Sequence, residues 1–133
     1  MKSRHLLLIA LFLTGLSLFL YGCQANSNSA SPKALLDKYF SSAMKQDYAT
    51  TYTCYYKAYQ DKVSQEDYVK HRKQASILRS YKVTSLKQSD VTAQAEVLLT
   101  FAPSKKLSRN KPVTVRAKED LIKEDNQWKI KVW

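Results

Sequence analysis

The chain has 133 residues, a formal net charge of +11 and a pI near 9.7. Its two cysteines and two histidines are too few for a disulfide framework or for a Cys/His metal site. They also exclude a histidine-centred acyl-transfer site, because one of the two, His5, lies in the N-terminal signal segment described next. We therefore expect no metal and no cofactor.

The first 22 residues have the composition of a secretory signal segment. Basic Lys2 and Arg4 precede fifteen uncharged, mostly apolar residues, 6–20. This stretch is short for a membrane-spanning helix, so we expect it to be cleaved. An uncleaved N-terminal anchor is the alternative, because two further residues would just allow the segment to span. Either interpretation places the rest of the chain outside the cytoplasm.

The segment ends in Leu20-Tyr21-Gly22-Cys23, which resembles the lipobox of bacterial lipoproteins. The resemblance implies that Cys23 is the lipidation site, although Tyr21 stands where a small residue is usual. Several acyl chains of the palmitate type on one residue would make the membrane attachment essentially permanent. Gln24 is not the aspartate that retains many lipoproteins at the inner membrane, so in a diderm bacterium an outer-membrane site is allowed.

The charge of the remaining chain is strongly basic. Residues 1–22 hold two of the 22 basic residues and none of the 11 acidic ones, which leaves a net charge of +9. Such an excess favours polyanions, and at the cell envelope these are anionic lipid head groups, teichoic acids or lipopolysaccharide rather than nucleic acid. Two stretches, 70–87 and 105–118, are basic and free of acids. They are either ordinary solvated faces or a polyanion-binding surface with the candidate residues Lys105, Lys106, Arg109 and Lys111.

A tether and one domain follow the expected cleavage site. Residues 24–31 are polar and of low complexity, and together with Cys23 they form a flexible segment. Eight such residues have a root-mean-square reach of about 15 Å, so the domain should sit close to the lipid surface. Residues 32–133 suffice for one small domain. Within it we expect Cys54 to be unpaired, buried and inert.

Three helices are predicted at the start of the domain. Ser31 and Pro32 are typical of a helix start. A second helix should begin after the cap residue Asp47, and a third should run from Ser64 to about Gln74 from a near match to the capping box. Tyrosines recur at helical spacing in the second helix and should share one face: Tyr48, Tyr52, Tyr55, Tyr56 and Tyr59.

From Ile77 onward the hydrophobic period changes from helical spacing to two residues. The alternation predicts strands near 76–88, near 91–101, from 113 onward and near 128–132, joined by polar connections at 87–90, 104–112 and 124–127 that suit hairpins. Three helices followed by an antiparallel sheet with one apolar face predict an α+β fold. The helices should pack on a curved sheet of about four strands.

This order of elements is similar to that of the nuclear-transport-factor-2-like superfamily. The similarity rests also on Lys45-Gln46-Asp47-Tyr48-Ala49 between the first two helices and on the closing Asp125-Asn126-Gln127-Trp128-Lys129-Ile130 hairpin. Bacterial lipoproteins with such a domain resemble this chain most. The resemblance implies a cone closed by helices, whose mouth holds a ligand in some members. Some members are isomerases, dehydratases or cyclases and others are binding or dimerisation modules, so the fold leaves the function open.

An enzyme of this kind needs an acid or a base inside the cone, and strand parity places almost none there. Glu96 lies opposite the apolar side of its strand, and His71 lies in a basic helix that should be solvated. Glu119 alone shares parity with the apolar side, where burial would raise its pKa and suit it to proton transfer. The adjacent apolar pair Leu121 and Ile122 signals a bulge that would instead leave Glu119 exposed or paired.

The five tyrosines and Glu119 together are the candidate pocket residues. Aromatic residues at helical spacing usually belong to the core, but five hydroxyls need partners, so some should reach a rim or a pocket. We therefore expect a lipid-anchored, extracytoplasmic module at the cell envelope that binds an amphipathic ligand or a partner protein without catalysis. Two alternatives stay open. One is a small isomerase-like or dehydratase-like enzyme with Glu119 as general base, and the other is a scaffold that holds anionic envelope polymers through its basic faces.

Overall fold

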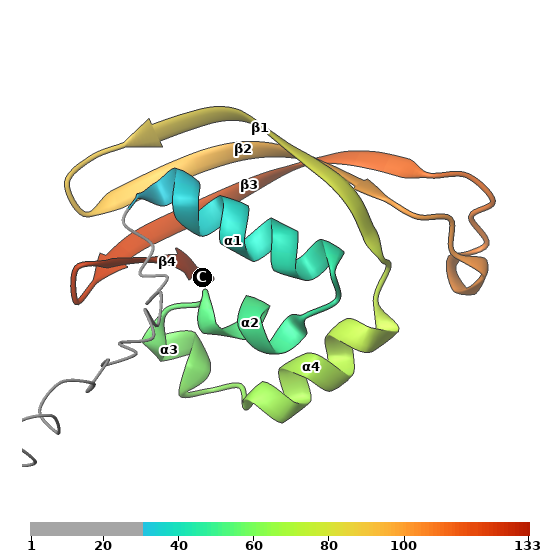
Figure 1. Ribbon diagram of the computed structural model, residues 1–133, viewed down its shortest axis with the longest axis horizontal. Coiled ribbons are helices and arrows are strands. Elements are labelled where there is room, and N and C mark those ends of the chain that lie inside the picture. The colour runs from blue at the N-terminus through green and yellow to red at the C-terminus, as the bar shows by residue number, and fades with distance from the viewer. Residues whose placement is uncertain (1–30) are drawn as a thin grey trace, which may run out of the picture.

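The computed structural model describes residues 31–133, so the signal segment, Cys23 and residues 24–30 of the tether lie outside the described residues. The described part folds into one antiparallel sheet in the order β1-β2-β3-β4, with its helices on the concave side (Figure 1). This is the expected α+β fold. Its elements are α1 Pro32–Met44, α2 Tyr48–Thr53, α3 Lys57–Gln60, α4 Gln65–Gln74, β1 Leu78–Gln88, β2 Thr92–Phe101, the 3-10 turn η1 Lys105–Leu107, β3 Val113–Glu124 and β4 Gln127–Lys131.

The helix starts that were predicted from capping residues are confirmed. In each, a side-chain oxygen accepts a backbone N–H three residues further on at 3.1 Å: Ser31 from Ala34, Asp47 from Thr50 and Ser64 from Asp67. Each of these bonds satisfies one of the N–H groups that a helix leaves without an internal partner.

The prediction of a single second helix carrying all five tyrosines is wrong. Helix α2 ends at Thr53, and α3 is a separate turn that begins at Lys57. Between them the chain pairs with β4: the Tyr56 N–H donates to the Ile130 carbonyl at 3.0 Å, and the Ile130 N–H donates to the Cys54 carbonyl at 2.8 Å. These bonds to the sheet replace the helical hydrogen bonds, so the five tyrosines do not share one helix face.

The ladder between β2 and β3 is continuous from Phe101 paired with Val113 to Thr92 paired with Ile122. Strand β3 therefore runs up to the expected polar connection at 124–127, and the bulge signalled by Leu121 and Ile122 is absent from this ladder. In the unbroken register Glu119 pairs with the fully buried Ala95 and faces the concave side. Strand β1 is less regular, with register shifts between Leu78 and Ser80 and between Val83 and Ser85.

The core lies between α1 and the concave face of the sheet. Leu36 and Phe40 of α1 pack there with Val97, Leu121 and Ile130 of three strands. Fully burying a side chain of this kind contributes about 1.5–3 kcal/mol.

A polar contact orients α1 on β1. The Phe40 ring stacks on Tyr81 with centroids 4.9 Å apart, and the Tyr81 hydroxyl donates to Asp37 at 3.0 Å.

Cys54 is buried, as predicted, and burial raises the pKa of its thiol. Within residues 31–133, no helix is long and apolar enough to span a membrane.

Candidate functional site

A pocket of about 580 Å³ opens where α3 and α4 meet the last residue of the chain. Helix α4 contributes one wall, the segment from α2 through α3 contributes a second, and the C-terminal residue closes the rim. The lining residues are aromatic and basic for the most part: Tyr55, Tyr59, Lys62, Val63, Asp67, Tyr68, His71, Arg72 and Trp133.

The walls of the pocket are aromatic rings in mutual contact. The Tyr55 ring lies 4.5 Å from that of Tyr59 and 5.4 Å from that of Tyr68. Trp133, which is 68% exposed, packs 5.6 Å from Tyr59 and lies under the Lys62 ammonium at 5.5 Å. Rings that brace one another in this way present flat, rigid faces to a ligand.

The phenol groups behind these walls are neutral hydrogen-bonding groups. The hydroxyls of Tyr39 and Tyr55 lie 2.7 Å apart, and burial raises the pKa of both. Burial also raises the pKa of Tyr68, whose hydroxyl lies near that of Tyr55. At neutral pH the Tyr68 phenol is therefore neutral.

Arg72 is the electrostatic centre of the site. Its positive charge partly opposes the rise in the pKa of four tyrosines and of Glu119. Its guanidinium carbon lies 5.6 Å from the centre of the Tyr48 ring, a cation–π contact. Its Nε is buried without a hydrogen-bond partner among the described residues.

Glu119 lies on the concave face of the sheet and is not one of the residues that line the pocket. Burial, with the negative charge of Asp120, raises its pKa to about 7, and Arg72 partly offsets this rise. The carboxyl group is consequently part protonated at neutral pH. No group of three His, Cys, Asp or Glu side chains that could hold a metal ion gathers within residues 31–133.

Neither a protein-family model nor a curated protein matches the chain. Similar solved structures include a SEC-C motif containing protein from Rhodopseudomonas palustris, with 14% identity, a TM-score of 0.66 and 81% of each chain covered. A second such protein, from Psychrobacter arcticus, has 14% identity and a TM-score of 0.59, over 78% of this chain and 59% of that one. An NTF2-like protein of unknown function from Pseudomonas putida KT2440 has 14% identity and a TM-score of 0.51, over 74% of this chain and 78% of that one.

The domain has the nuclear-transport-factor-2-like fold. Identities of 14% support the shape of the chain and not its activity.

The five tyrosines of the predicted stripe have different roles in this domain. Tyr55 and Tyr59 line the pocket. The other three are structural: Tyr48 lies against Arg72, Tyr52 donates to the Val63 carbonyl at 2.7 Å, and Tyr56 donates to the Val132 carbonyl at 2.5 Å. The bond from Tyr56 holds the C-terminal segment next to the pocket.

Sequence reasoning missed the pocket residues of α4 and the C-terminus. Tyr68, His71 and Arg72 stand at i, i+3 and i+4, so they share one face of the helix. That spacing indicates a shared helix face, but the neighbouring basic residues favoured the prediction that this face is exposed to solvent. His71 is exposed, as expected, yet it lines the pocket rim. Nothing in the local pattern indicated Trp133.

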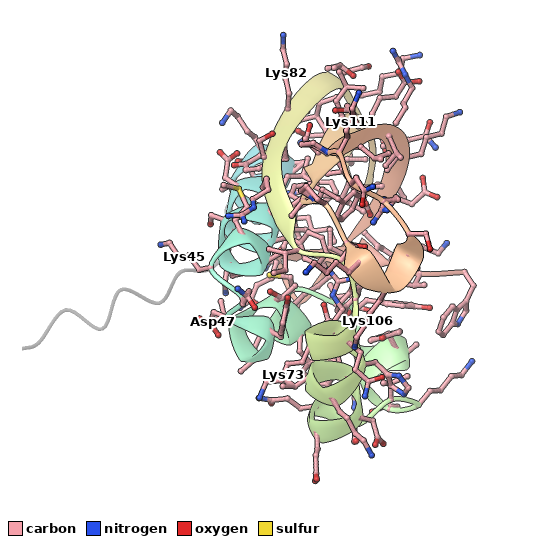
Figure 2. All side chains as sticks on the ribbon, turned by 90° about the vertical axis from the view of Figure 1, so that its right-hand side faces the viewer. Lys45, Asp47, Lys73, Lys82, Lys106 and Lys111 are labelled. Atoms are coloured by element: carbon pink, nitrogen blue, oxygen red, sulfur yellow. The ribbon has the colours of Figure 1, made fainter. Side chains whose placement is uncertain are left out.

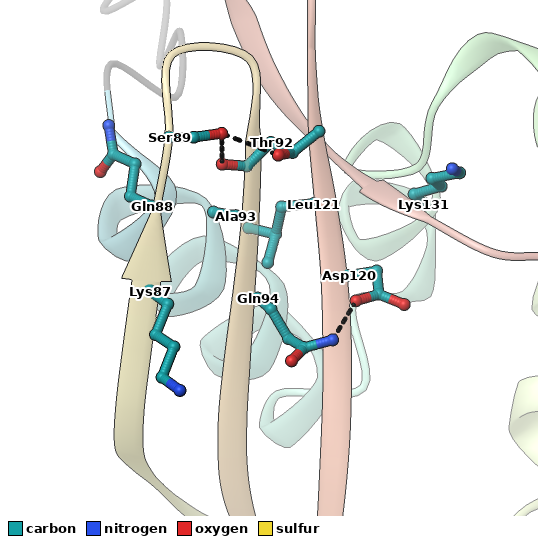
Figure 3. Close-up of a pocket in the computed structure, with 9 residues that line it drawn as sticks. All are labelled: Lys87, Gln88, Ser89, Thr92, Ala93, Gln94, Asp120, Leu121 and Lys131. Carbon is teal, nitrogen blue, oxygen red and sulfur yellow. Dashed lines mark hydrogen bonds between the residues drawn. The ribbon is translucent and has the colours of Figure 1, made fainter.

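A second groove, of about 550 Å³, lies at the end of the sheet near the β1–β2 turn (Figure 3). Lys87, Gln94, Asp120 and Lys131 follow one another across the four strands in register. The Gln94 amide donates to Asp120 at 2.8 Å. None of the residues lining this groove has a buried polar atom without a partner. The pocket beside α4 is therefore the better candidate for a ligand site.

Proposed function

We propose that this nuclear-transport-factor-2-like domain is a non-catalytic binding module, held at the extracytoplasmic membrane surface by lipid on Cys23. The observation that carries the proposal is a pocket that combines aromatic walls with a buried polar atom, Arg72 Nε, that has no hydrogen-bond partner within residues 31–133. A buried polar group without a partner costs about 1–3 kcal/mol. A bound acceptor would recover that free energy.

The chemistry of the pocket favours a small amphipathic ligand with an anionic group. Arg72 would form charge-assisted hydrogen bonds with an anion, while Tyr59 and Trp133 offer ring faces to a flat or apolar portion. Asp67, the acid of the pocket, accepts a hydrogen bond from the Ser64 hydroxyl at 2.8 Å as part of the α4 cap. The cations Lys62, His71 and Arg72 line the same space.

A test uses 1-anilinonaphthalene-8-sulfonate, an aromatic sulfonate with the expected combination of ring and anion. Its fluorescence should rise on binding to the native protein, and Arg72→Gln should weaken the affinity about 10- to 100-fold, because hydrogen bonds to a charged group contribute about 1.5–3 kcal/mol. The matched control is Lys70→Gln, which removes one charge from the same helix outside this pocket. It should leave the affinity unchanged.

Native mass spectrometry of protein extracted from membranes gives an independent readout. The wild type should retain a small molecule that the Arg72→Gln variant loses. Equal dye affinities for the two variants, with thermal melts that show both to be folded, would contradict a binding role for this pocket.

Lipidation of Cys23 has its own test. Cys23→Ala should abolish metabolic labelling with a fatty-acid analogue and release the protein from the membrane fraction. Cys54 serves as an internal control, because its buried side chain leaves no accessible thiol for acylation. Labelling that persists in the Cys23→Ala variant would rule out the lipobox interpretation.

A second candidate function is catalysis with Glu119 as general base. The observation that favours it is the inward orientation of Glu119 together with a pKa raised to about 7, which suits proton transfer. Glu119→Gln separates the two functions, because it preserves shape and removes the base. A binding module should still complement a deletion strain with this variant, whereas an enzyme that depends on Glu119 should not.

A further inference from the structure

One end of the domain carries a dense group of lysines, which we call the basic end. The group comes from the end of α4 and from the β2–β3 loop, and in Figure 2 Lys73, Lys106 and Lys111 follow one another from bottom to top along one strip. Asp47, the acid labelled in that view, lies to the side of the strip near Lys45. All members of the basic end are exposed: Lys73, Lys105, Lys106 and Lys111.

The lysines of the basic end are not neutralised within the described chain. The ion pairs found in residues 31–133 join Lys33 to Asp37, Lys57 to Asp61 and Arg116 to Glu96. Like charges gathered without counter-charges create a positive potential that attracts anions. An anionic partner is therefore the complement of this surface.

The loop that presents these lysines is held in place by its own hydrogen bonds. Ser104 and Arg109 exchange two backbone bonds of 3.0 Å across the loop. The Arg109 guanidinium donates to the Ser76 hydroxyl at 2.7 Å, which fastens the loop to the connection between α4 and β1. Arg109, expected as a polyanion contact, is thus half-buried and supports the loop, while Lys105, Lys106 and Lys111 stay exposed. A surface ordered in advance loses less entropy on binding.

The basic end lies away from the start of α1. Helix α1, to which the tether connects, begins at the opposite end of the sheet from the β2–β3 loop (Figure 1). The ten residues of β2 run between the two ends and span about 33 Å. The basic end therefore lies about one strand length from the point at which the lipid-bearing segment would join the domain.

We infer that the basic end binds a linear phosphate-rich polymer of the cell envelope, outside the membrane that carries the anchor. A strip of lysines can contact successive phosphates of one chain, and such contacts release counterions and depend strongly on salt. The inference goes beyond the pocket and uses the proposed lipidation of Cys23 only for orientation. Arg72 and the aromatic pocket take no part in it.

The experiment uses the full-length lipidated protein in phosphatidylcholine vesicles and fluorescent long-chain inorganic polyphosphate as the probe. Lys105→Ala, Lys106→Ala and Lys111→Ala combined should weaken binding at least tenfold. The matched control is Lys87→Ala, Lys123→Ala and Lys131→Ala combined, which removes the same charge from exposed lysines near the β1–β2 and β3–β4 turns. It should change the affinity less than threefold, and added salt should weaken binding to the wild type steeply.

Three outcomes would overturn the inference. Equal losses in the two triple variants would show an effect of net charge alone, and salt-independent binding would show that phosphates are not the contacts. Loss of polyphosphate binding when phosphatidylglycerol is added to the same vesicles would show that the basic end lies on anionic lipid instead. The Cys23→Ala chain in solution should bind the polymer as the wild type does, so a failure of anchoring is told apart from a failure of the basic end.

Discussion

Replacing Tyr55 with alanine is expected to lower the free energy of unfolding by about 3–5 kcal/mol, the usual cost of truncating a buried aromatic side chain. Tyr55 is 8% exposed, and its ring contacts those of Tyr39, Tyr59 and Tyr68. The loss is a large part of the roughly 5–15 kcal/mol that stabilises a domain. Urea unfolding at neutral pH measures it.

The matched control for this variant is Tyr55→Phe, which keeps the ring and removes the hydroxyl that lies 2.7 Å from that of Tyr39. Leaving the Tyr39 hydroxyl unpaired should cost about 1–3 kcal/mol, clearly less than the alanine variant. If the two variants were equally stable, ring packing would contribute nothing and the description of Tyr55 as a wall between core and pocket would be wrong.

Glu119→Gln is expected to change how stability depends on pH. The folded state raises the pKa of Glu119 from 4.5 to about 7, mainly by burial. Between these values the folded protein binds more protons than the unfolded chain, so stability falls as the pH rises through this window. Removing the group should abolish that fall and make the variant about 1–3 kcal/mol more stable than the wild type above neutral pH.

Urea unfolding midpoints measured from acidic to mildly alkaline pH test this expectation. Glu96→Gln is the control, because Glu96 faces outward from the neighbouring strand and pairs with Arg116 at 3.0 Å. It should keep the wild-type decline in stability. A parallel decline in the Glu119→Gln protein would show that the Glu119 carboxyl is solvated rather than buried.

Local signals predicted the helix starts and the strands correctly, because side-chain caps and the two-residue alternation act within a few positions. The prediction of one continuous second helix is wrong because of a tertiary contact. Tyr52, Tyr55 and Tyr59 follow helical spacing. The backbone hydrogen bonds that Ile130 accepts from Tyr56 and donates to Cys54, across more than seventy residues, nevertheless override that local preference. A single sequence carries no sign of that contact.

The candidate site, too, was predicted from the sequence only in part. Parity along one strand was enough to orient Glu119, since the β2–β3 ladder is unbroken there. The pocket could not be assembled from parity, because Tyr59, Arg72 and Trp133 come from three separate segments. These residues come together because of the path that the chain takes after α2. The helical pattern predicted that part of the chain incorrectly.

The two edges of the sheet have a consequence for how copies of the protein behave when crowded together. An open edge strand is a template for pairing with another chain and so for aggregation. The backbone around Tyr56 already occupies part of the β4 edge through its bonds to Ile130. The β1 edge carries two register shifts and the exposed charges of Lys82 and Lys87. Both features disfavour the pairing of these edges with a strand of another copy.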